Sequence, residues 1–485
     1  MTASQPANTV PQRASSIAKA IVPLAIGAAI AFTPVPQGLS VNAWRYFALF
    51  AAVIAGVITE PVPPAAVGLG GVVLAAIFGL VRASPAEATA WALSGFGNST
   101  VWLIFAAYMF ALGYSKTGLG RRLALLLIQG MGKRTLGLGY AITLADLVLA
   151  PFTASTTARS GGTIFPIIRN IPELYGSRPG DDSARKIGAY LMYTAASTTL
   201  VTSSMFITAL APNALAISII ARTLNITISW MDWFKGFAPI GITLLILVPV
   251  LLYKIYPPEI KEAPEAPRWA RAELRAMGPV TRRELTLLVL VIGALTLWIG
   301  ATTYVDPAVA AMLAVVLMVI LGVVSWDDIT GNSQAWNVLV WFATLVTLAS
   351  GLAETRFIDW LAQSIVPSLP GLGGFATIVG LVGAFYFLHY FFATITAHTA
   401  TLFPVFLAIA VQIPVVSPKA WALLLGYSLG LMGILTPYGG AHLAVYYGSG
   451  YIKGRDFWRL CLILGIVFFC VYMAIIVPWL AFLKV

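Results

Sequence analysis

Long apolar segments follow one another along nearly the whole chain, separated by short polar or basic stretches. Apolar runs of about 18 or more residues are typical of membrane-spanning helices, whereas a membrane β-barrel shows alternating segments of about ten residues. The pattern therefore predicts an all-α polytopic membrane protein with about eleven transmembrane helices. The predicted spans lie near residues 17–34, 43–59, 62–81, 100–115, 187–222, 237–256, 285–303, 305–324, 336–351, 420–450 and 457–483.

Two further apolar segments, 135–175 and 375–411, are interrupted near the middle by small polar residues. One straight helix over the first segment would be roughly 60 Å long, about twice the hydrocarbon core, and Pro151 and Pro166 disfavour it. Two full spans and one re-entrant hairpin both return the chain to the same side. The polar centre is better explained by a hairpin tip that is buried within protein, so we predict a hairpin in each segment.

The basic loops divide the chain and orient it. We predict an N-terminal tail (1–16), a first membrane half (17–256), a cytoplasmic linker (257–283) and a second half (284–485). Because Lys and Arg in loops favour the cytoplasm, the N-terminus is predicted inside and the C-terminus outside. The first hairpin then enters from the cytoplasm and the second from outside, which makes the halves inverted repeats.

Composition supports this assignment and removes one alternative. The chain is 59% hydrophobic and only 10% charged, which no soluble domain of this size matches. Its formal net charge of +11 could suggest nucleic acid, but the basic residues cluster in loops, as membrane topology requires. We therefore expect the lipid bilayer, and no nucleic acid, as a partner.

A polar motif of the pattern A-[ST]-x-T-A-[RH]-[ST] occurs once in each predicted hairpin. It reads Ala154-Ser155-Thr156-Thr157-Ala158-Arg159-Ser160 and Ala393-Thr394-Ile395-Thr396-Ala397-His398-Thr399. Thr163-Ile164-Phe165-Pro166 and Thr401-Leu402-Phe403-Pro404 follow as matching tails. Hydroxyl donors beside free helix N-termini make an anion site, so both tips are predicted to bind substrate.

Arg159 and His398 take the same place in the two copies. Two cations and two sets of donors suit a small dianion with one carboxylate for each half. Two alternatives remain open: Arg159 could be a loop charge that snorkels to the cytoplasm, and His398 a neutral ring bonded to a carbonyl. Asp146 is expected in an interhelical bond or ion pair, and His389 in packing.

Two of the predicted spans contain polar breaks that could form the other walls of the site. Thr436 and Pro437 begin a break in the span 420–450. In the first half the counterpart is 202–204, with Ser203 at its centre, although 211–213 competes for that role. Backbone unwound in this way supplies free carbonyl and N–H groups at membrane depth.

From about residue 40 onward, the chain resembles the divalent anion:sodium symporter family, in its branch of 2-oxoglutarate/malate and citrate/succinate exchangers. That family carries Ser-Asn-Thr at each hairpin tip, where this chain has Ser155-Thr156-Thr157 and Thr394-Ile395-Thr396. Gly448-Ser449-Gly450-Tyr451 also looks like the exchanger branch. The resemblance implies a homodimer in a bacterial inner membrane, with a scaffold domain and a mobile transport domain that work by elevator-type alternating access.

Both signature asparagines, which help to hold sodium in the family, are missing here. Thr156 and Ile395 replace them, and the side chain of Ile395 cannot coordinate a cation. We hypothesise that Arg159 and His398 replace the sodium ions. Because a side chain cannot leave with the substrate, an empty transport domain would carry unpaired charge, which is costly in low dielectric and enforces exchange.

The favoured function is a sodium-independent exchanger of dicarboxylates such as 2-oxoglutarate, malate and succinate, with citrate left open. The alternative is a sodium- or proton-coupled symporter, and an anion channel fits closed midplane hairpins less well. No cofactor or metal is expected. An enzyme is the weakest option, because the chain has no zinc signature, no Ser/His/Asp grouping and only three histidines.

Overall fold

A computed structural model describes residues 10–301, 304–365 and 373–485, and regular structure in this part is helical apart from one isolated bridge between Arg134 and Glu262. The first half contains α1 (Val10–Phe32), α2 (Val41–Thr59), α3 (Pro64–Ile77), α4 (Pro85–Leu93), α5 (Ser99–Thr117), α6 (Leu119–Met131), α7 (Thr135–Leu149), α8 (Phe165–Ile168), α9 (Gly188–Met205), α10 (Ala211–Leu224) and α11 (Trp230–Ile255). The linker and second half contain α12 (Glu265–Ala276), α13 (Arg282–Gly300), α14 (Pro307–Ile320), α15 (Trp326–Thr330), α16 (Ser333–Glu354), α17 (Phe357–Ile365), α18 (Gly374–Phe387), α19 (Ile395–Val411), α20 (Pro418–Met432), α21 (Ala441–Gly448) and α22 (Gly454–Phe482).

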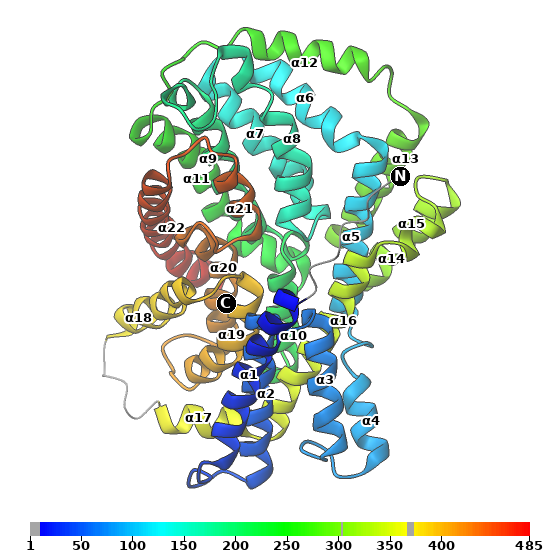
Figure 1. The fold of residues 1–485 in the computed structure, drawn as a ribbon, viewed down its shortest axis with the longest axis vertical. Coiled ribbons are helices and arrows are strands. Elements are labelled where there is room, and N and C mark those ends of the chain that lie inside the picture. The colour runs from blue at the N-terminus through cyan, green and yellow to red at the C-terminus, as the bar shows by residue number, and fades with distance from the viewer. Residues whose placement is uncertain (1–9, 302–303, 366–372) are drawn as a thin grey trace.

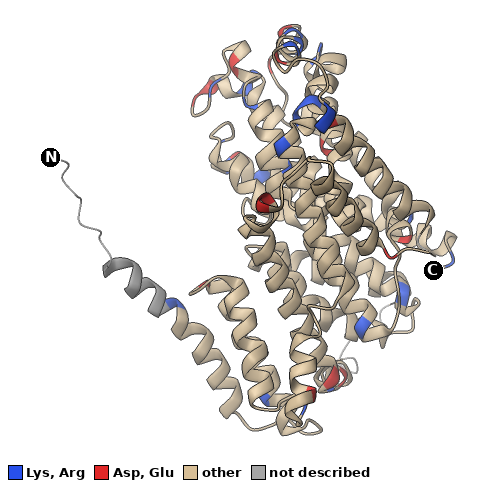
Figure 2. Ribbon diagram, turned by 90° about the vertical axis from the view of Figure 1, so that its right-hand side faces the viewer, with Lys and Arg blue, Asp and Glu red and all other residues tan. Residues whose placement is uncertain are grey.

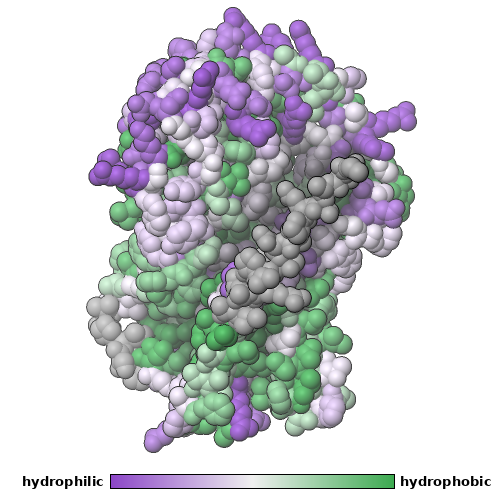
Figure 3. All heavy atoms as spheres, in the orientation of Figure 1, coloured by the Kyte–Doolittle hydropathy of each residue, from purple (hydrophilic) through white to green (hydrophobic). Residues whose placement is uncertain are grey.

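The membrane character of the chain is visible in these helices. Among the described residues, eight helices are long and apolar enough to cross a membrane, and five shorter apolar helices accompany them. Leu285, Val289 and Ile292 on α13 are more than half exposed and lie on one face. The face shown in Figure 3 is hydrophobic over its lower part and hydrophilic at the upper end. The chain is therefore a multi-pass membrane protein.

The N-terminal boundary differs from the sequence prediction. Helix α1 begins at Val10, so residues 10–16, which were assigned to the polar tail, are helical. Hydropathy marks where an apolar span begins, whereas a helix continues into polar residues that tolerate helical geometry. Pro11, in the first turn, is a residue type suited to a helix start.

The order of elements in the first half recurs in the second (Figure 1). In each half a long helix (α5 or α16) leads through a shorter one (α6 or α17) into a helix–break–helix unit. We call the unit at 135–168 hairpin 1 and the unit at 374–411 hairpin 2. An interrupted helix follows each unit, and then a long helix, α11 or α22.

The two hairpins turn in the same way at the same motif position. A 3-10 turn, η1 (Ala150–Phe152) or η7 (Leu388–Phe391), precedes each tip. The Ser155 hydroxyl accepts a hydrogen bond from the Ala158 N–H at 3.2 Å, and the Thr394 hydroxyl accepts one from the Ala397 N–H at 3.1 Å. Both side chains therefore act as caps of the helix that leaves the tip.

After the tips, the hairpins differ by one residue. Ser160 and Thr163 are separated by two glycines, whereas Thr399 and Thr401 are separated by one alanine. Hairpin 1 accommodates its extra residue as a π-helix, η2 (Thr157–Ile164), while hairpin 2 continues as the α-helix α19. One inserted residue is what a π-helical turn absorbs, and such turns are frequent at functional sites.

The linker is structured rather than extended. It forms α12, which packs along α6 at the end of the molecule where charged residues gather (Figures 1 and 2). The buried Arg122 on α6 pairs with Glu284 on α13 at 2.6 Å and donates to the Gly278 carbonyl at 3.0 Å. Thr135, at the start of hairpin 1, holds the other side of the linker by donating to the carbonyls of Ile260 and Lys261.

Candidate binding site

Each hairpin tip lies against the break of one interrupted helix. Tip 1 (residues 153–156) meets the first break (206–210), where the Ala211 N–H donates to the Ala154 carbonyl at 3.1 Å. Tip 2 (392–394) and the preceding turn lie beside the second break (433–440), where a His389 ring nitrogen is 2.9 Å from the Gly439 carbonyl oxygen. In each half, the irregular backbone of a hairpin tip therefore meets the irregular backbone of a helix break.

The hairpins also pack across the halves. The π-helix η2 contacts α21, with the Ser160 and Tyr446 hydroxyls 2.8 Å apart, and α19 contacts α10. Each hairpin is thus held by the break of its own half and by a short helix of the other. This arrangement brings the two polar motifs into one helical unit.

The structure places neither of the two sequence candidates within the first break itself. Thr202-Ser203-Ser204 lies in the last turns of α9 and Ala211-Pro212-Asn213 in the first turn of α10, so both flank the break. The Asn213 amide donates to the Ser203 carbonyl at 2.7 Å and to the Phe206 carbonyl at 3.0 Å. Asn213 therefore satisfies carbonyls that the end of α9 leaves free.

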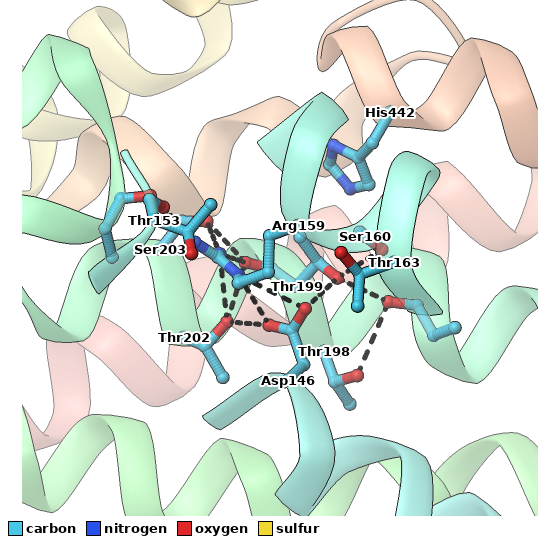
Figure 4. A network of polar contacts seen from close by, with 12 residues as sticks. Asp146, Thr153, Arg159, Ser160, Thr163, Thr198, Thr199, Thr202, Ser203 and His442 are labelled. Atoms are coloured by element: carbon cyan, nitrogen blue, oxygen red, sulfur yellow. Dashed lines mark hydrogen bonds and ion pairs between the residues drawn. The ribbon is translucent and has the colours of Figure 1, made fainter. Parts of the chain in front are cut away.

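Arg159 is fully buried and lies at the centre of the hydrogen-bond network in Figure 4. One terminal nitrogen, Nη1, donates to the Thr153 carbonyl at 2.7 Å and to the Ala209 carbonyl at 3.0 Å. The other, Nη2, lies 2.7 Å from the Ser203 hydroxyl and 3.4 Å from the Thr199 carbonyl. The guanidinium therefore joins tip 1, the first break and α9.

Asp146 is the counter-charge of Arg159. Both carboxylate oxygens lie 3.2 Å from Nε of Arg159, and the carboxylate also accepts bonds from the hydroxyls of Thr199 and Thr202. The expectation of an interhelical bond or ion pair for Asp146 is confirmed. The expectation that Arg159 adds unpaired charge to an empty transport domain is wrong for this conformation, because Asp146 neutralises it. A cation buried this deeply is costly unless a carboxylate and hydrogen bonds compensate it.

His398 has a different environment. Its ring is buried and packs edge-on against Phe385 and Phe392, with the His389 ring centroid 5.3 Å away. Neither ring nitrogen has a hydrogen-bond partner among the described residues. The alternative of a His398 ring bonded to a carbonyl therefore does not hold in this conformation; His389 makes that bond instead.

Arg159 and His398 occupy equivalent motif positions but do not meet. Within the described part of the chain, the contacts of Arg159 are with hairpin 1, α9 and the first break, and those of His398 are with hairpin 2. The side chains of Leu200 and Ile395 both pack against Gly433, where an added Cβ would lie 2.9 Å from each. Apolar packing thus lies between the two halves of the site.

The other predicted site residues are divided between the tips and the second break. Thr156 and Ile395 are buried directly after the caps, and Thr157 and Thr396 are half-buried. Pro437 is buried, and Thr436 is buried with a hydroxyl that finds no partner in the described residues. A capping hydroxyl uses only a lone pair, so the Thr394 O–H group stays free to donate to an anion. The Ser155 hydroxyl also has a side-chain hydrogen bond with Tyr108.

Two adjoining cavities lead toward tip 1. One, of about 430 Å³, is lined by Thr153, Ala158 and Arg159 and also by Tyr108 and Asp328. The second, of about 480 Å³, shares Tyr114, Ser115, Gly162 and Thr163 with it and reaches Arg121, Asn170 and Trp269 near α12. Together they connect the charged end of the molecule with the hairpin tip.

Charge at the cavity wall is already paired. Lys116, at the end of α5, lies 2.8 Å from Asp328 on the short surface helix α15. Its hydrogen bond, supported by those from Ser325, lowers the pKa of Asp328 to about 2. Asp328 is therefore anionic at every physiological pH and neutralises Lys116.

Three residues of this unit were not singled out from the sequence as ligands or supports. Asn213 had a visible signal, as an amide directly after Pro212 within an apolar segment. Tyr446 and His442 had none, because their roles depend on packing between halves: Tyr446 meets Ser160, and a ring nitrogen of His442 lies 3.0 Å from the Ala196 carbonyl oxygen. Across the described residues, no group of three or more His, Cys, Asp or Glu side chains could hold a metal ion.

Comparison with known proteins decides the family. The chain matches the sodium:sulfate symporter transmembrane region over residues 14–485. The chain belongs to this family, that of the divalent anion:sodium symporters. It is 47% identical over 460 residues to the L-tartrate/succinate antiporters of Shigella sonnei (strain Ss046) and Escherichia coli (strain K12), covering 92% of this chain and 94% of each relative.

A solved structure supports the fold of this family member. The YdaH transporter of Alcanivorax borkumensis superimposes with a TM-score of 0.55 at 14% identity, covering 98% of this chain and 99% of the other. That likeness concerns the fold alone. The family assignment confirms the resemblance drawn from the hairpin motifs and identifies a transport protein rather than an enzyme.

Proposed function

We propose that the protein is a sodium-independent exchanger of C4–C5 dicarboxylates, including succinate, tartrate, malate and 2-oxoglutarate. The relatives at 47% identity are named as antiporters of tartrate and succinate, two C4 dianions. Hydroxyl donors at two tips and two interrupted helices suit carboxylates at both ends of such a substrate.

The observation that carries sodium independence is the position of the Arg159 guanidinium. Nη1 bonds the carbonyls of Thr153 and Ala209, and Nη2 approaches that of Thr199. Unwound carbonyls at helix breaks are the ligands that bind sodium in transporters of this kind. A side chain that occupies them replaces a mobile cation with a fixed one.

His398 is the matching residue in hairpin 2, and we assign it the second fixed positive charge when the site is loaded. Its ring nitrogens lack partners among the described residues. A carboxylate that approaches tip 2 could supply the missing acceptor and favour the protonated ring. Thr394, Thr396, Thr436 and Pro437 would then line the same end of the substrate.

Alternating access is proposed to be of the elevator type. The hairpins and interrupted helices form one packed unit. Aromatic side chains lie where this unit meets α5 and α13. Phe152 of hairpin 1 stacks on Trp298, with ring centroids 6.1 Å apart, and Phe110 approaches both. In the proposed topology of eleven crossings and two hairpins, α6 and α12 face the cytoplasm of a bacterial inner membrane, the C-terminus lies outside, and two copies form a homodimer.

Counterflow in proteoliposomes tests the function. Uptake of labelled succinate is expected only when the vesicles contain a dicarboxylate, and it should be equal in sodium and choline buffers. A panel with tartrate, malate, 2-oxoglutarate and citrate inside defines the substrate range. Accumulation that is driven by a sodium gradient into empty vesicles would contradict the proposal; accumulation driven by a pH gradient would support a proton-coupled symporter.

A further inference from the structure

The two halves of the site are electrically unequal. Asp146 and Arg159 are thirteen positions apart in hairpin 1, and Phe385 and His398 have the same spacing in hairpin 2. Both pairs are in contact: the first is an ion pair, and the second is an edge-on ring contact with centroids 4.5 Å apart. A carboxylate of the protein in one half therefore corresponds to an apolar ring in the other.

Arg159 has no donor left for a substrate in this conformation. An arginine has five N–H groups. Nε points to the Asp146 carboxylate, Nη1 bonds two carbonyls, and Nη2 reaches Ser203 together with the Thr199 carbonyl and the Thr202 hydroxyl. The internal carboxylate already occupies the position that a substrate carboxylate would take beside the guanidinium.

In contrast to the fully used donors of Arg159, several polar atoms beside hairpin 2 have no partner among the described residues. The side chains around His398 leave four buried polar atoms without partners in the described structure: both ring nitrogens of His398, Nδ1 of His389 and the hydroxyl of Thr436. These groups belong together, since a Cβ on Gly439 would lie 3.0 Å from the Thr436 hydroxyl and 3.1 Å from Nε2 of His389. Unsatisfied buried polar atoms at one place indicate a polar ligand or water.

We propose that Asp146 is a positioning residue that neutralises Arg159 and holds it as a strut between tip 1 and the first break. A dianionic substrate is then distinguished from a monoanion at the end of the site that contains His398. This inference rests on the proposed dicarboxylate exchange. Arg159 then fixes the relative position of tip 1 and the first break and adds no net charge to the site. This holds in both the loaded and the empty carrier.

Charge-selective kinetics test the proposal. KM is measured in counterflow for succinate, and for monomethyl succinate, which carries one charge less, in wild type, Asp146→Asn, Arg159→Gln and the double variant. Removing the Asp146 charge should lower KM about tenfold for succinate and about threefold for the monoester, because a Coulomb energy scales with ligand charge. Arg159→Gln should instead raise KM for both succinate and the monoester.

The double variant separates charge from structure. It should keep the wild-type ratio of the two KM values within about twofold, because a neutral pair is replaced by neutral groups, while kcat falls at least about tenfold because the strut is lost. His398→Gln should instead lower the preference for succinate. Glu284→Gln is the matched control: it removes the carboxylate of the other buried ion pair, with Arg122, and should leave both KM values unchanged.

Three results would overturn the proposal. One is equal shifts of KM for both ligands in Asp146→Asn, which indicate a purely structural role. Another is a double variant that loses the preference for succinate, which means that the substrate senses the charge of Arg159. The double variant tests the proposal even if the Asp146→Asn protein cannot be recovered from membranes. The third is an unchanged preference in His398→Gln. A wild-type protein without dicarboxylate counterflow would instead refute the proposed function itself.

Discussion

At the residue scale, the two motifs share a cap and differ in what the cap supports. Ser155 and Thr394 cap their helices in the same way, although one is followed by a paired arginine and the other by an unpartnered histidine. The common residue caps the helix, and the variable residue, Arg159 or His398, determines whether the buried polar groups beside the tip are already paired. This division explains why the repeat is recognisable while its halves behave differently.

The Arg159 strut depends on a planar fork of donors. In Arg159→Lys the positive charge remains, but an ammonium has three donors and cannot reach the two carbonyls, Asp146 and Ser203 together. Each buried group left unpaired costs about 1–3 kcal/mol. We expect succinate counterflow to fall at least about tenfold.

Arg268→Lys is the control for that substitution, since Arg268 pairs with Glu265 at the exposed surface of α12. Exposed pairs contribute about 0–1 kcal/mol, so its transport should match wild type. Wild-type counterflow in the Arg159→Lys variant would show that charge alone is sufficient at this position.

The caps make a second prediction. Replacing Ser155 or Thr394 by alanine should destabilise the helix that leaves the tip by about 1 kcal/mol and lower the equilibrium constant between the formed and the open tip about fivefold. Counterflow should fall by a similar factor, with little change in the melting temperature of the purified protein. Thr396→Ala, at a neighbouring position that is not a cap, should retain a formed tip, as seen by protection of tip cysteines from a thiol reagent. Equal cysteine reactivity in all three variants would exclude the capping role.

The sequence identified the equivalence of Arg159 and His398 but not the environment of either. Their spacing within a repeated motif is visible in the letters of the chain. The pairing of Arg159 with Asp146 depends on how the two arms of hairpin 1 face α9, which hydropathy does not encode. The isolation of His398 depends in the same way on Phe385 and Phe392.

At the element scale, the difference between the hairpins comes from one glycine. The extra residue between Ser160 and Thr163 forces η2 into π-helical geometry, which places Ser160 against Thr199 and Tyr446. Hairpin 2 has no such insertion, and Thr399 bonds back to the Ile395 carbonyl of its own helix. A π-helical turn therefore redirects a hydroxyl from its own helix toward neighbouring elements.

Deleting Gly162 should convert η2 into an α-helix of the same register as α19. Residues on both sides of the deletion should keep their places, because a π-helical turn is what absorbs one inserted residue. The Ser160 hydroxyl should instead turn back toward its own helix, as that of Thr399 does, and lose its contact with Tyr446. We expect the protein to remain folded, with counterflow reduced at least about tenfold, as measured beside its thermal unfolding curve. Full activity in this variant would mean that the π-helix is a passive insertion.

Broken helices were predictable and the π-helix was not. Thr436-Pro437 and Ala211-Pro212 carry the proline that restricts regular hydrogen bonding, so their breaks are visible as chemistry. The π-helix appears only when the two motif tails are aligned and one residue is left over. Helix boundaries such as Val10 have no comparable marker, because polar residues that favour helices extend beyond the apolar span.

At the scale of the whole molecule, the packing of η2 on α21 and of α19 on α10 makes both hairpins part of one unit. The sequence predicts the order of elements in each half, but nothing in a single chain shows which short helix crosses to which hairpin. The cavities beside α5 and tip 1 likewise depend on side chains from distant segments, such as Tyr108 and Asp328. The packing between the halves and the cavities are therefore defined only by the three-dimensional structure.

Exchange of one dianion for another through this unit moves no net charge across the membrane, whether the fixed charges of the site sum to zero or to one. The expected result is that a potential of about 100 mV of either sign, imposed with potassium and valinomycin, changes the final distribution of labelled succinate in succinate–tartrate exchange less than about twofold. A symporter that carries one uncompensated charge would gain about 2.3 kcal/mol per 100 mV, equivalent to about a fiftyfold change in accumulation. The same insensitivity should hold for Glu284→Gln and for Asp146→Asn, because a fixed charge that crosses with one dianion returns with the other and cancels over the full cycle. A distribution that follows the potential in Asp146→Asn would show that the empty carrier also returns, and therefore that exchange is no longer obligatory.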